Sequence, residues 1–299
     1  MCIRDRSKTC LILEGGGFKI AFTAGVLDTF LTASFRPFDQ YIGISGGTIA
    51  ASYYLSEQFR FILKAMHFLA ADKSFLDYKR AFDDEGYMNI DFIKKVAIEE
   101  IPFDFEKALK AVKDKEIHFV ATNRKQGTPE YLSPTNAKDW LDYAVASSTL
   151  PFVTKGKHKI NGKAYFDGGW SDPLPVKWAY ENGARKILII RTFPLEYREV
   201  QSWTDYFGSF YFKESKGLKK VFDDSYKWYN EAVDFINNPP KDLIIEQISP
   251  EEILKSRTYS YTPETINQDY RHGVERGMLF LYNKLHKDKL AETSKHFLG

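Results

Sequence analysis

The chain has 299 residues, enough for one large domain or two small ones. Apolar residues make up 43% of it and charged residues 27%, as in ordinary globular proteins, and a formal net charge of +2 gives no broad basic surface for nucleic acid. The sequence has no run of about 18 or more consecutive apolar residues, so it predicts no transmembrane helix.

The first six residues, MCIRDR, are best kept apart from the fold. This peptide is encoded by a DNA sequence that resembles the transposon end used to tag sequencing libraries, so we expect residues 1–7 to be an adapter-derived or disordered leader. Cys2 lies in this leader and Cys10 is the only other cysteine, so no intrachain disulfide is expected. This cysteine usage fits a reducing compartment, and we expect a cytoplasmic protein.

Short apolar runs recur along the chain, at residues 10–14, 41–45, 116–122, 185–192 and 242–249. Several are nearly continuous in apolar residues rather than alternating, which indicates strands buried on both faces, as in a parallel sheet. Helical patterns lie between them, for example over 136–148, and a closing helix begins at Thr262 and Pro263, a good cap and first-turn pair. Strands that alternate with helices predict a three-layer α/β/α sandwich with a mostly parallel central sheet.

The part of the chain after residue 195 is rich in aromatic residues. One helical stretch places five aromatic side chains together, at Trp203, Tyr206, Phe207, Phe210 and Tyr211. Four lysines follow, at Lys213, Lys216, Lys219 and Lys220. Such a stretch is more often a core helix packed on the sheet, and the alternative is a helix that acts as a lid or lies at a membrane interface. We interpret 8–195 as an α/β core and 196–299 as a helical elaboration, with a closing strand and helix, packed on the same domain.

The sequence GISGG, at 43–47, is the sharpest chemical signal. It fits the pattern G-x-S-x-G after an apolar strand and before a helix, which is the context of a nucleophile elbow with Ser45 as the nucleophile. Gly43 and Gly47 would allow the tight backbone, and the start of the helix would favour an oxyanion beside Ser45. The plainer alternative is a glycine-rich turn that happens to contain a serine.

A nucleophilic serine needs a base, and the sequence offers an aspartate more readily than a histidine. None of the six histidines follows a strand in a glycine-bounded loop, and His158 is the least implausible of them. Asp167, in FDGG at 166–169, would be held at a loop tip, and Asp172 is a second acidic candidate. Both also fit ordinary turns. Because a free aspartate has a pKa of about 3.9, it could serve as a base only in a desolvated site with a stabilised oxyanion.

The sequence EGGGFK, at 14–19, could supply that second element. Backbone amides of the glycines at 15–17, at the start of a helix, would suit either a nucleotide phosphate or an oxyanion. The nucleotide-binding interpretation lacks a G-K-[S/T] ending and an acidic residue at the end of a second strand. Together with Ser45 and Asp167, the glycines therefore favour an oxyanion hole.

In this order, EGGGFK, GISGG and FDGG resemble the three signature blocks of patatin-like phospholipases, which are serine lipid acyl hydrolases with a Ser–Asp dyad and a three-layer α/β/α fold. The stretch 144–155 resembles the small-residue helix and proline turn that precede the aspartate in this family. The resemblance covers roughly 8–195, and the stretches 225–236 and 245–277 resemble the C-terminal part of a bacterial subgroup.

The resemblance implies a catalytic role for each matching residue. By it, Ser45 is the nucleophile, Asp167 is the base, Gly15, Gly16 and Gly17 line the oxyanion hole, and Lys19 holds the basic position after the glycines, where it either orders the loop or meets a lipid phosphate. It implies a lipid ester substrate and neither a metal nor a cofactor. Contact with the inner face of a membrane is a further expectation, and the oligomeric state is not predicted.

The sequence departs from the family pattern at Ile20, where the family has a glycine. A β-branched residue would disturb the loop if the backbone there needed a positive φ, and it would cost little if the helix had already begun. We expect the helix to have already begun at Ile20. Three alternatives stay open: an acyltransferase on the same fold, a non-catalytic lipid-binding protein and a nucleotide-binding α/β protein.

Overall fold

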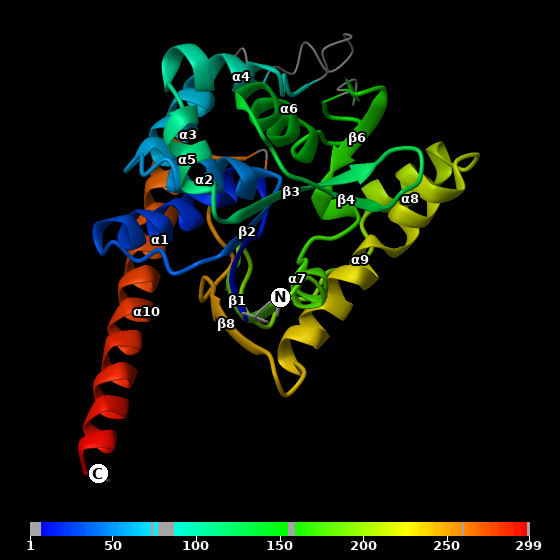
Figure 1. The fold of residues 1–299 in the computed structure, drawn as a ribbon. Coiled ribbons are helices and arrows are strands. Elements are labelled where there is room, and N and C mark those ends of the chain that lie inside the picture. Colours follow the sequence, from blue (N-terminus) through cyan, green and yellow to red (C-terminus); the bar gives the residue numbers. More distant parts are fainter. Residues whose placement is uncertain (1–6, 73–74, 77–86, 155–158, 259, 298–299) are drawn as a thin grey trace.

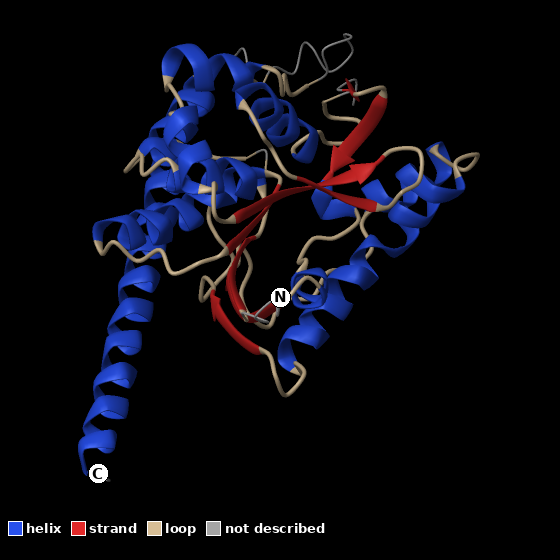
Figure 2. Cartoon of the chain, in the orientation of Figure 1, coloured by secondary structure: helices blue, strands red, loops and turns tan. Residues whose placement is uncertain are grey.

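The computed structural model describes residues 7–72, 75–76, 87–154, 159–258 and 260–297, with side chains up to His286. The expected leader lies outside the described residues except for Ser7, and His158 also lies outside them. A twisted central sheet is flanked by helices on both faces (Figure 1, Figure 2).

Five strands run parallel in the order β3-β2-β1-β7-β8. Their bounds are β1 (Lys8–Leu13), β2 (Gln40–Ile44), β3 (Glu116–Asn123), β7 (Ala184–Ile190) and β8 (Ile244–Ile248). Each overlaps one of the apolar runs that predicted a strand. β2 is buried along its whole length, as expected for a strand covered on both faces.

Three short antiparallel strands extend the sheet on the β3 side. They are β4 (Pro129–Leu132), β5 (Lys159–Ile160) and β6 (Lys163–Asp167). β6 pairs with the end of β3, which places Asp167 opposite Ala121. This pairing carries the last residue of β6 to the edge where the parallel strands also end.

Helices cover both faces of the sheet. The helices on one side are α1 (Ile20–Thr32), α2 (Gly46–Leu55), α3 (Phe61–Ala71), α4 (Phe92–Lys95), α5 (Phe105–Ala111), α6 (Ala137–Ser147) and α10 (Pro263–Phe297). Those on the other side are α7 (Val176–Glu181) and α9 (Lys216–Asn237), and α8 (Trp203–Tyr211) packs on α9 at the outer edge of the molecule. The described residues also form two single helical turns, η1 (Gly17–Lys19) and η4 (Gly168–Trp170), and a π-helical stretch, η3 (Val96–Glu100).

Alternate side chains of the parallel strands enter two separate cores. Leu11 and Leu13 of β1 belong to the larger core, together with side chains of α1, α2 and α3. Cys10 and Ile12 belong to the other core, with side chains of α7 and α9. This is the period-two pattern of a strand covered on both faces. The predicted three-layer α/β/α arrangement with a helical C-terminal region is therefore confirmed.

The C-terminal helix packs closely on the helix that follows the first glycines. A Cβ atom added at Gly25 of α1 would lie 2.1 Å from the Tyr270 carbonyl oxygen, and one added at Gly273 of α10 would lie 1.9 Å from the Phe22 carbonyl oxygen. Only glycine at both positions allows the two backbones to approach this closely. Beyond this contact, α10 extends away from the rest of the molecule (Figure 1).

The aromatic stretch after residue 202 forms the predicted helix, α8, but its interpretation as a core helix is wrong. The five aromatic side chains named for it are all exposed, and the buried residues of α8 are Asp205 and Gly208. A tight contact between Gly208 and the Phe222 ring explains the orientation, because a larger residue at 208 would not fit against α9. Among the described residues, no helix is both long enough and apolar enough to cross a bilayer.

Candidate active site

Ser45 occupies a strained turn between β2 and α2. Its backbone has φ 54° and ψ −126°, a conformation that non-glycine residues rarely adopt and that is typical of a nucleophile elbow. The Ser45 amide donates a hydrogen bond to Ser147 Oγ at 3.0 Å. The Ser45 carbonyl oxygen accepts from the Thr48 hydroxyl at 2.7 Å and the Thr48 amide at 2.9 Å. These three bonds hold the serine in its strained conformation.

The two glycines on either side of this turn lie against backbone atoms. A Cβ atom at Gly47 would lie 2.2 Å from the Leu13 carbonyl oxygen, and one at Gly43 would lie 2.8 Å from the Thr48 amide nitrogen. Because backbone atoms cannot move away as a side chain could, neither site accepts alanine without a shift of β1 or α2. The strand–turn–helix geometry thus depends on both glycines.

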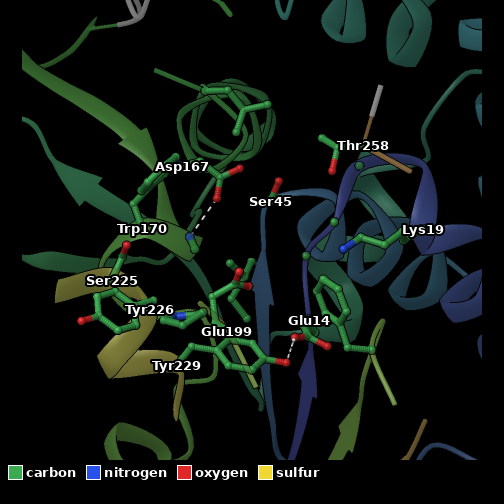
Figure 3. Close-up of a pocket in the computed structure, with 18 of the residues that line it drawn as sticks. Glu14, Lys19, Ser45, Asp167, Trp170, Glu199, Ser225, Tyr226, Tyr229 and Thr258 are labelled. Carbon is green, nitrogen blue, oxygen red and sulfur yellow. Dashed lines mark hydrogen bonds between the residues drawn. The ribbon is translucent and has the colours of Figure 1, made fainter. Parts of the chain in front are cut away.

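Asp167 is the last residue of β6, and its carboxylate is directed toward Ser45 (Figure 3). The side chain is only 4% exposed, and its carboxylate accepts a hydrogen bond from the Gly169 amide at 2.8 Å. Burial raises its pKa to about 6, against the opposing effect of hydrogen bonds from the Ser45 hydroxyl and the Gly169 amide. A carboxylate with this pKa is a stronger base than a free aspartate and is still ionised at neutral pH.

The glycine loop runs beside the nucleophile turn. A Cβ atom at Gly15 would lie 2.8 Å from Ser45 Cβ, so the two segments are in direct contact. Gly16 and Gly17 have φ values of 139° and 57°. No described residue accepts a hydrogen bond from either of their amides. Unpaired amides of this kind, next to a serine and at the start of a helix, are suited to hold an oxyanion.

The departure at Ile20 does not disturb this loop. Ile20 lies in a helix, as predicted; it is the first residue of α1, and its φ of −64° is an ordinary helical value. The side chain is buried in the larger core. A β-branched residue therefore fits here without strain.

Lys19 faces the same pocket and is almost fully buried, with 8% of its surface exposed. Its ammonium nitrogen lies 3.4 Å from the centre of the Phe193 ring, and no hydrogen bond from it to a described residue is formed. Burial lowers its pKa to about 8, although Glu14 and Glu199 partly offset this effect. A buried ammonium with unused donors is suited to receive a negatively charged group.

Glu14, directly before the glycines, joins the loop to the C-terminal region. Its carboxylate accepts hydrogen bonds from the Thr192 amide at 2.6 Å and from the Tyr229 hydroxyl at 3.0 Å. The Thr192 hydroxyl also donates to the Gly15 carbonyl oxygen at 2.6 Å, and Arg191 donates to the Tyr229 hydroxyl at 2.7 Å. No local sequence signal marks these contacts, because the partners are 177 to 215 residues away from the loop.

Two cavities meet at Ser45. The first is the more polar of the two and is called the polar cavity; it is shown in Figure 3 and contains both Ser45 and Asp167. Its walls include residues that the sequence did not single out, namely Glu14, Trp170, Phe193, Glu199, Ser202, Asp205, Ser225, Tyr226, Tyr229 and Thr258. The second is almost wholly apolar, with side chains that include Ile49, Met66, Leu69, Phe75, Met88, Ile90 and Ile93. Together the two cavities can hold a molecule whose apolar part lies on one side of Ser45 and whose polar part lies on the other.

The other candidate bases among the described residues do not line either cavity. Asp172 accepts a hydrogen bond from the Tyr131 hydroxyl on β4. The described histidine side chains are engaged elsewhere: His67 with Asn267, His118 with Ser133, His272 with Phe22 and His286 with Tyr282. Among the described residues, no group of three or more potential metal ligands occurs.

Comparisons with known proteins cover nearly the whole chain. A family model described as patatin-like phospholipase matches residues 11–180, and one described as a domain of unknown function, DUF6363, matches residues 216–285. The uncharacterized protein YjjU of Escherichia coli (strain K12) is 29% identical over 298 residues, which cover 97% of this chain and 82% of YjjU. The crystal structure of VipD from Legionella pneumophila is similar with a TM-score of 0.45 and 12% identity, covering 93% of this chain and 67% of that chain.

Proposed function

Because the chain belongs to the patatin-like phospholipase family, a family of lipid acyl hydrolases, we propose that it hydrolyses lipid esters of the phospholipase A or lysophospholipase type with Ser45 and Asp167. One observation carries this proposal. A serine in a strained elbow and a buried aspartate with a raised pKa share one pocket with the unpaired amides of a glycine loop. These are the nucleophile, base and oxyanion donors that acyl transfer needs.

The reaction follows from this arrangement. Asp167 takes the proton of the Ser45 hydroxyl as Ser45 Oγ attacks the ester carbonyl carbon, and the carbonyl oxygen becomes an oxyanion held by amides of the glycine loop. When the tetrahedral intermediate collapses, the alcohol leaves with the proton from Asp167, and an acyl-serine remains. Asp167 then takes a proton from the water that attacks the acyl-serine carbonyl carbon. When this second tetrahedral intermediate collapses, Asp167 returns the proton to Ser45 Oγ, and the carboxylic acid departs.

The proposal places the two ends of the substrate in the two cavities. The acyl chain enters the apolar cavity, where Met66, Leu69 and Ile90 exclude water. The alcohol part occupies the polar cavity beside Lys19, whose ammonium then meets a phosphate of the head group. A Lys19→Gln variant is expected to raise KM for a phospholipid while leaving KM for an uncharged ester of the same chain length unchanged. Equal changes for both substrates would instead assign Lys19 to ordering the loop.

The experiment that tests the proposed function is a panel of lipids incubated with the wild type and with Ser45→Ala and followed by mass spectrometry. Release of free fatty acid by the wild type alone is the expected result. Intact-protein mass spectrometry after a fluorophosphonate probe should show one adduct on the wild type and none on Ser45→Ala. Ser225→Ala is the matched control, because Ser225 faces the same pocket, and it should keep the adduct.

The same panel separates the alternatives. Transfer of the acyl group to an added alcohol, in place of fatty acid release, would identify an acyltransferase. Equal rates for the wild type and Ser45→Ala, together with no adduct on the wild type, would leave a non-catalytic lipid-binding protein. Thermal stabilisation by ATP or NAD without esterase activity would point to a nucleotide-binding protein.

A further inference from the structure

The helix α8 is oriented opposite to an ordinary surface helix. At about 100° per residue, its aromatic side chains lie within an arc of about 140°. All of them are exposed to solvent, with exposed fractions of 90% for Trp203, 57% for Tyr206, 55% for Phe207, 73% for Phe210 and 63% for Tyr211. The opposite side of the helix, with Asp205 and Gly208, is buried. A globular protein normally buries the apolar face and exposes the polar one.

This orientation is fixed by contacts with the rest of the molecule. Ser202 and Asp205 form a capping box at the start of α8, in which each side chain binds the other residue's backbone amide. Gly208 lies so close to α9 that an added Cβ atom would be 2.3 Å from the Phe222 ring. The outward-facing aromatic surface therefore belongs to a well-anchored helix.

The exposed surface borders the polar cavity. In the segment that leads into α8, cavity-lining residues alternate with exposed apolar residues. The lining residues are Phe193, Glu199, Ser202 and Asp205. The exposed apolar residues between and after them are Leu195, Val200, Trp203 and Tyr206. The same stretch of chain thus forms both the wall of the cavity and an apolar rim outside it.

The geometry points to this rim, residues 195–211, as the surface with which the enzyme docks on a phospholipid bilayer. The inference rests on the proposed function, since a lipid ester must pass from a bilayer into the cavity that the rim borders. Trp and Tyr are the side chains that favour the interface between water and lipid. Exposed Lys213, Lys216 and Lys220 follow the helix and add attraction to anionic head groups. Contiguous exposed aromatic residues of this kind mark an interaction site rather than ordinary surface.

The test separates docking from catalysis by using a double variant, Trp203→Ala with Phe210→Ala. Neither side chain lines the cavities that contain Ser45. Binding to vesicles is measured by co-sedimentation in the Ser45→Ala background, where no lipid is consumed. The double variant should lower the partition coefficient on the order of tenfold or more, because two large side chains lose their contact with the acyl region. Adding phosphatidylglycerol to phosphatidylcholine vesicles should strengthen binding.

Activity supplies the second readout. With Ser45 intact, the double variant should lose most of its activity on vesicles but keep, within about twofold, its rate on a water-soluble short-chain ester. A matched control replaces two exposed aromatic residues elsewhere, Phe59 and Tyr282, with alanine and should bind vesicles like the wild type. Brominated lipids should quench fluorescence in the wild type more than in Trp203→Phe.

Unchanged vesicle binding by the double variant would overturn the docking surface, as would an equal loss in the control. A second contrary result is a wild type that binds neither phosphatidylcholine vesicles nor those with added phosphatidylglycerol, while α8 is buried in an oligomer or a protein complex. That result would assign the surface to a protein partner and also overturn the proposal. A wild type that docks normally but cleaves no ester would contradict the proposed function alone.

Discussion

The two walls of the polar cavity are built in different ways. The nucleophile wall consists of Ser45, Asp167 and the glycine loop, and each part is a short turn at the end of a strand. The other wall, from Phe193 to Thr258, draws on a loop, α8, α9 and a second loop, and we call it the C-terminal wall. The nucleophile wall holds the groups that we propose to react, whereas the C-terminal wall shapes the space around them.

The two walls differ in the origin of the contacts that fix their conformation. In the nucleophile wall, the constraint is local: a positive φ at Ser45 and glycines pressed against backbone atoms. In the C-terminal wall, the constraint comes from distant contacts, such as the Tyr229 hydroxyl on Glu14 and Thr258 against Gly17. Changes in the first wall should therefore abolish the chemistry, and changes in the second should adjust it.

The largest effect is expected from Asp167→Asn. An amide cannot accept the serine proton, so we expect kcat to fall on the order of 10³-fold. Because burial disfavours the charged carboxylate, the thermal midpoint at pH 8 should stay the same or rise. Steady-state kinetics and a thermal melt measure the two effects. Asp172→Asn is the matched control outside the cavity and should keep activity within about threefold. Full activity of Asp167→Asn would contradict the proposed Ser45–Asp167 dyad.

A smaller effect, which also tests the nucleophile wall, is expected in the pH dependence of kcat/KM. Asp167 acts in its ionised form, so kcat/KM should fall as the pH drops through its pKa of about 6, reaching about one tenth of its plateau near pH 5. The assay is kcat/KM on an uncharged ester between pH 4.5 and 9. An acid limb near pH 4 would mean that the working carboxylate is not desolvated. With a phospholipid, loss of the Lys19 charge above its pKa of about 8 should add an alkaline limb.

The smallest effect is expected from Tyr229→Phe in the C-terminal wall. This change removes one of the hydrogen bonds that position Glu14 beside the glycine loop, and a bond of this kind contributes about 1 kcal/mol, or roughly fivefold in rate. We expect kcat to fall by about that factor with little change in KM. Tyr180→Phe, which removes an exposed hydrogen bond to Asp242, serves as the control. A purely structural role would lower the thermal midpoint and leave kcat of the folded fraction unchanged.

Several features of the fold could be predicted because their signals are local. Apolar runs predicted all five parallel strands, the helical pattern after the glycines predicted that Ile20 lies in a helix, and the cap pair Thr262–Pro263 predicted the start of α10. The short strands β4 to β6 were harder to predict, since the pairing of β4 and β6 with β3, and of β5 with β6, depends on contacts that no single run reveals. The domain boundary at residue 195 stays a prediction, as do the cytoplasmic location and the roles of Ser45, Asp167, Gly15–Gly17 and Lys19.

The sequence by itself determined the turn chemistry: glycines where backbones touch, a serine between a strand and a helix, and an aspartate before two glycines. These depend on residues within a few positions of each other, so a short motif contains them. Only the tertiary structure decided which face of α8 points outward and which residues complete the pocket. The hydrophobic pattern of α8 predicted that its aromatic face is buried. The close contact between Gly208 and Phe222 instead places the opposite face of the helix against α9. That contact, like the one between Glu14 and Tyr229, joins residues whose proximity only the folded chain creates.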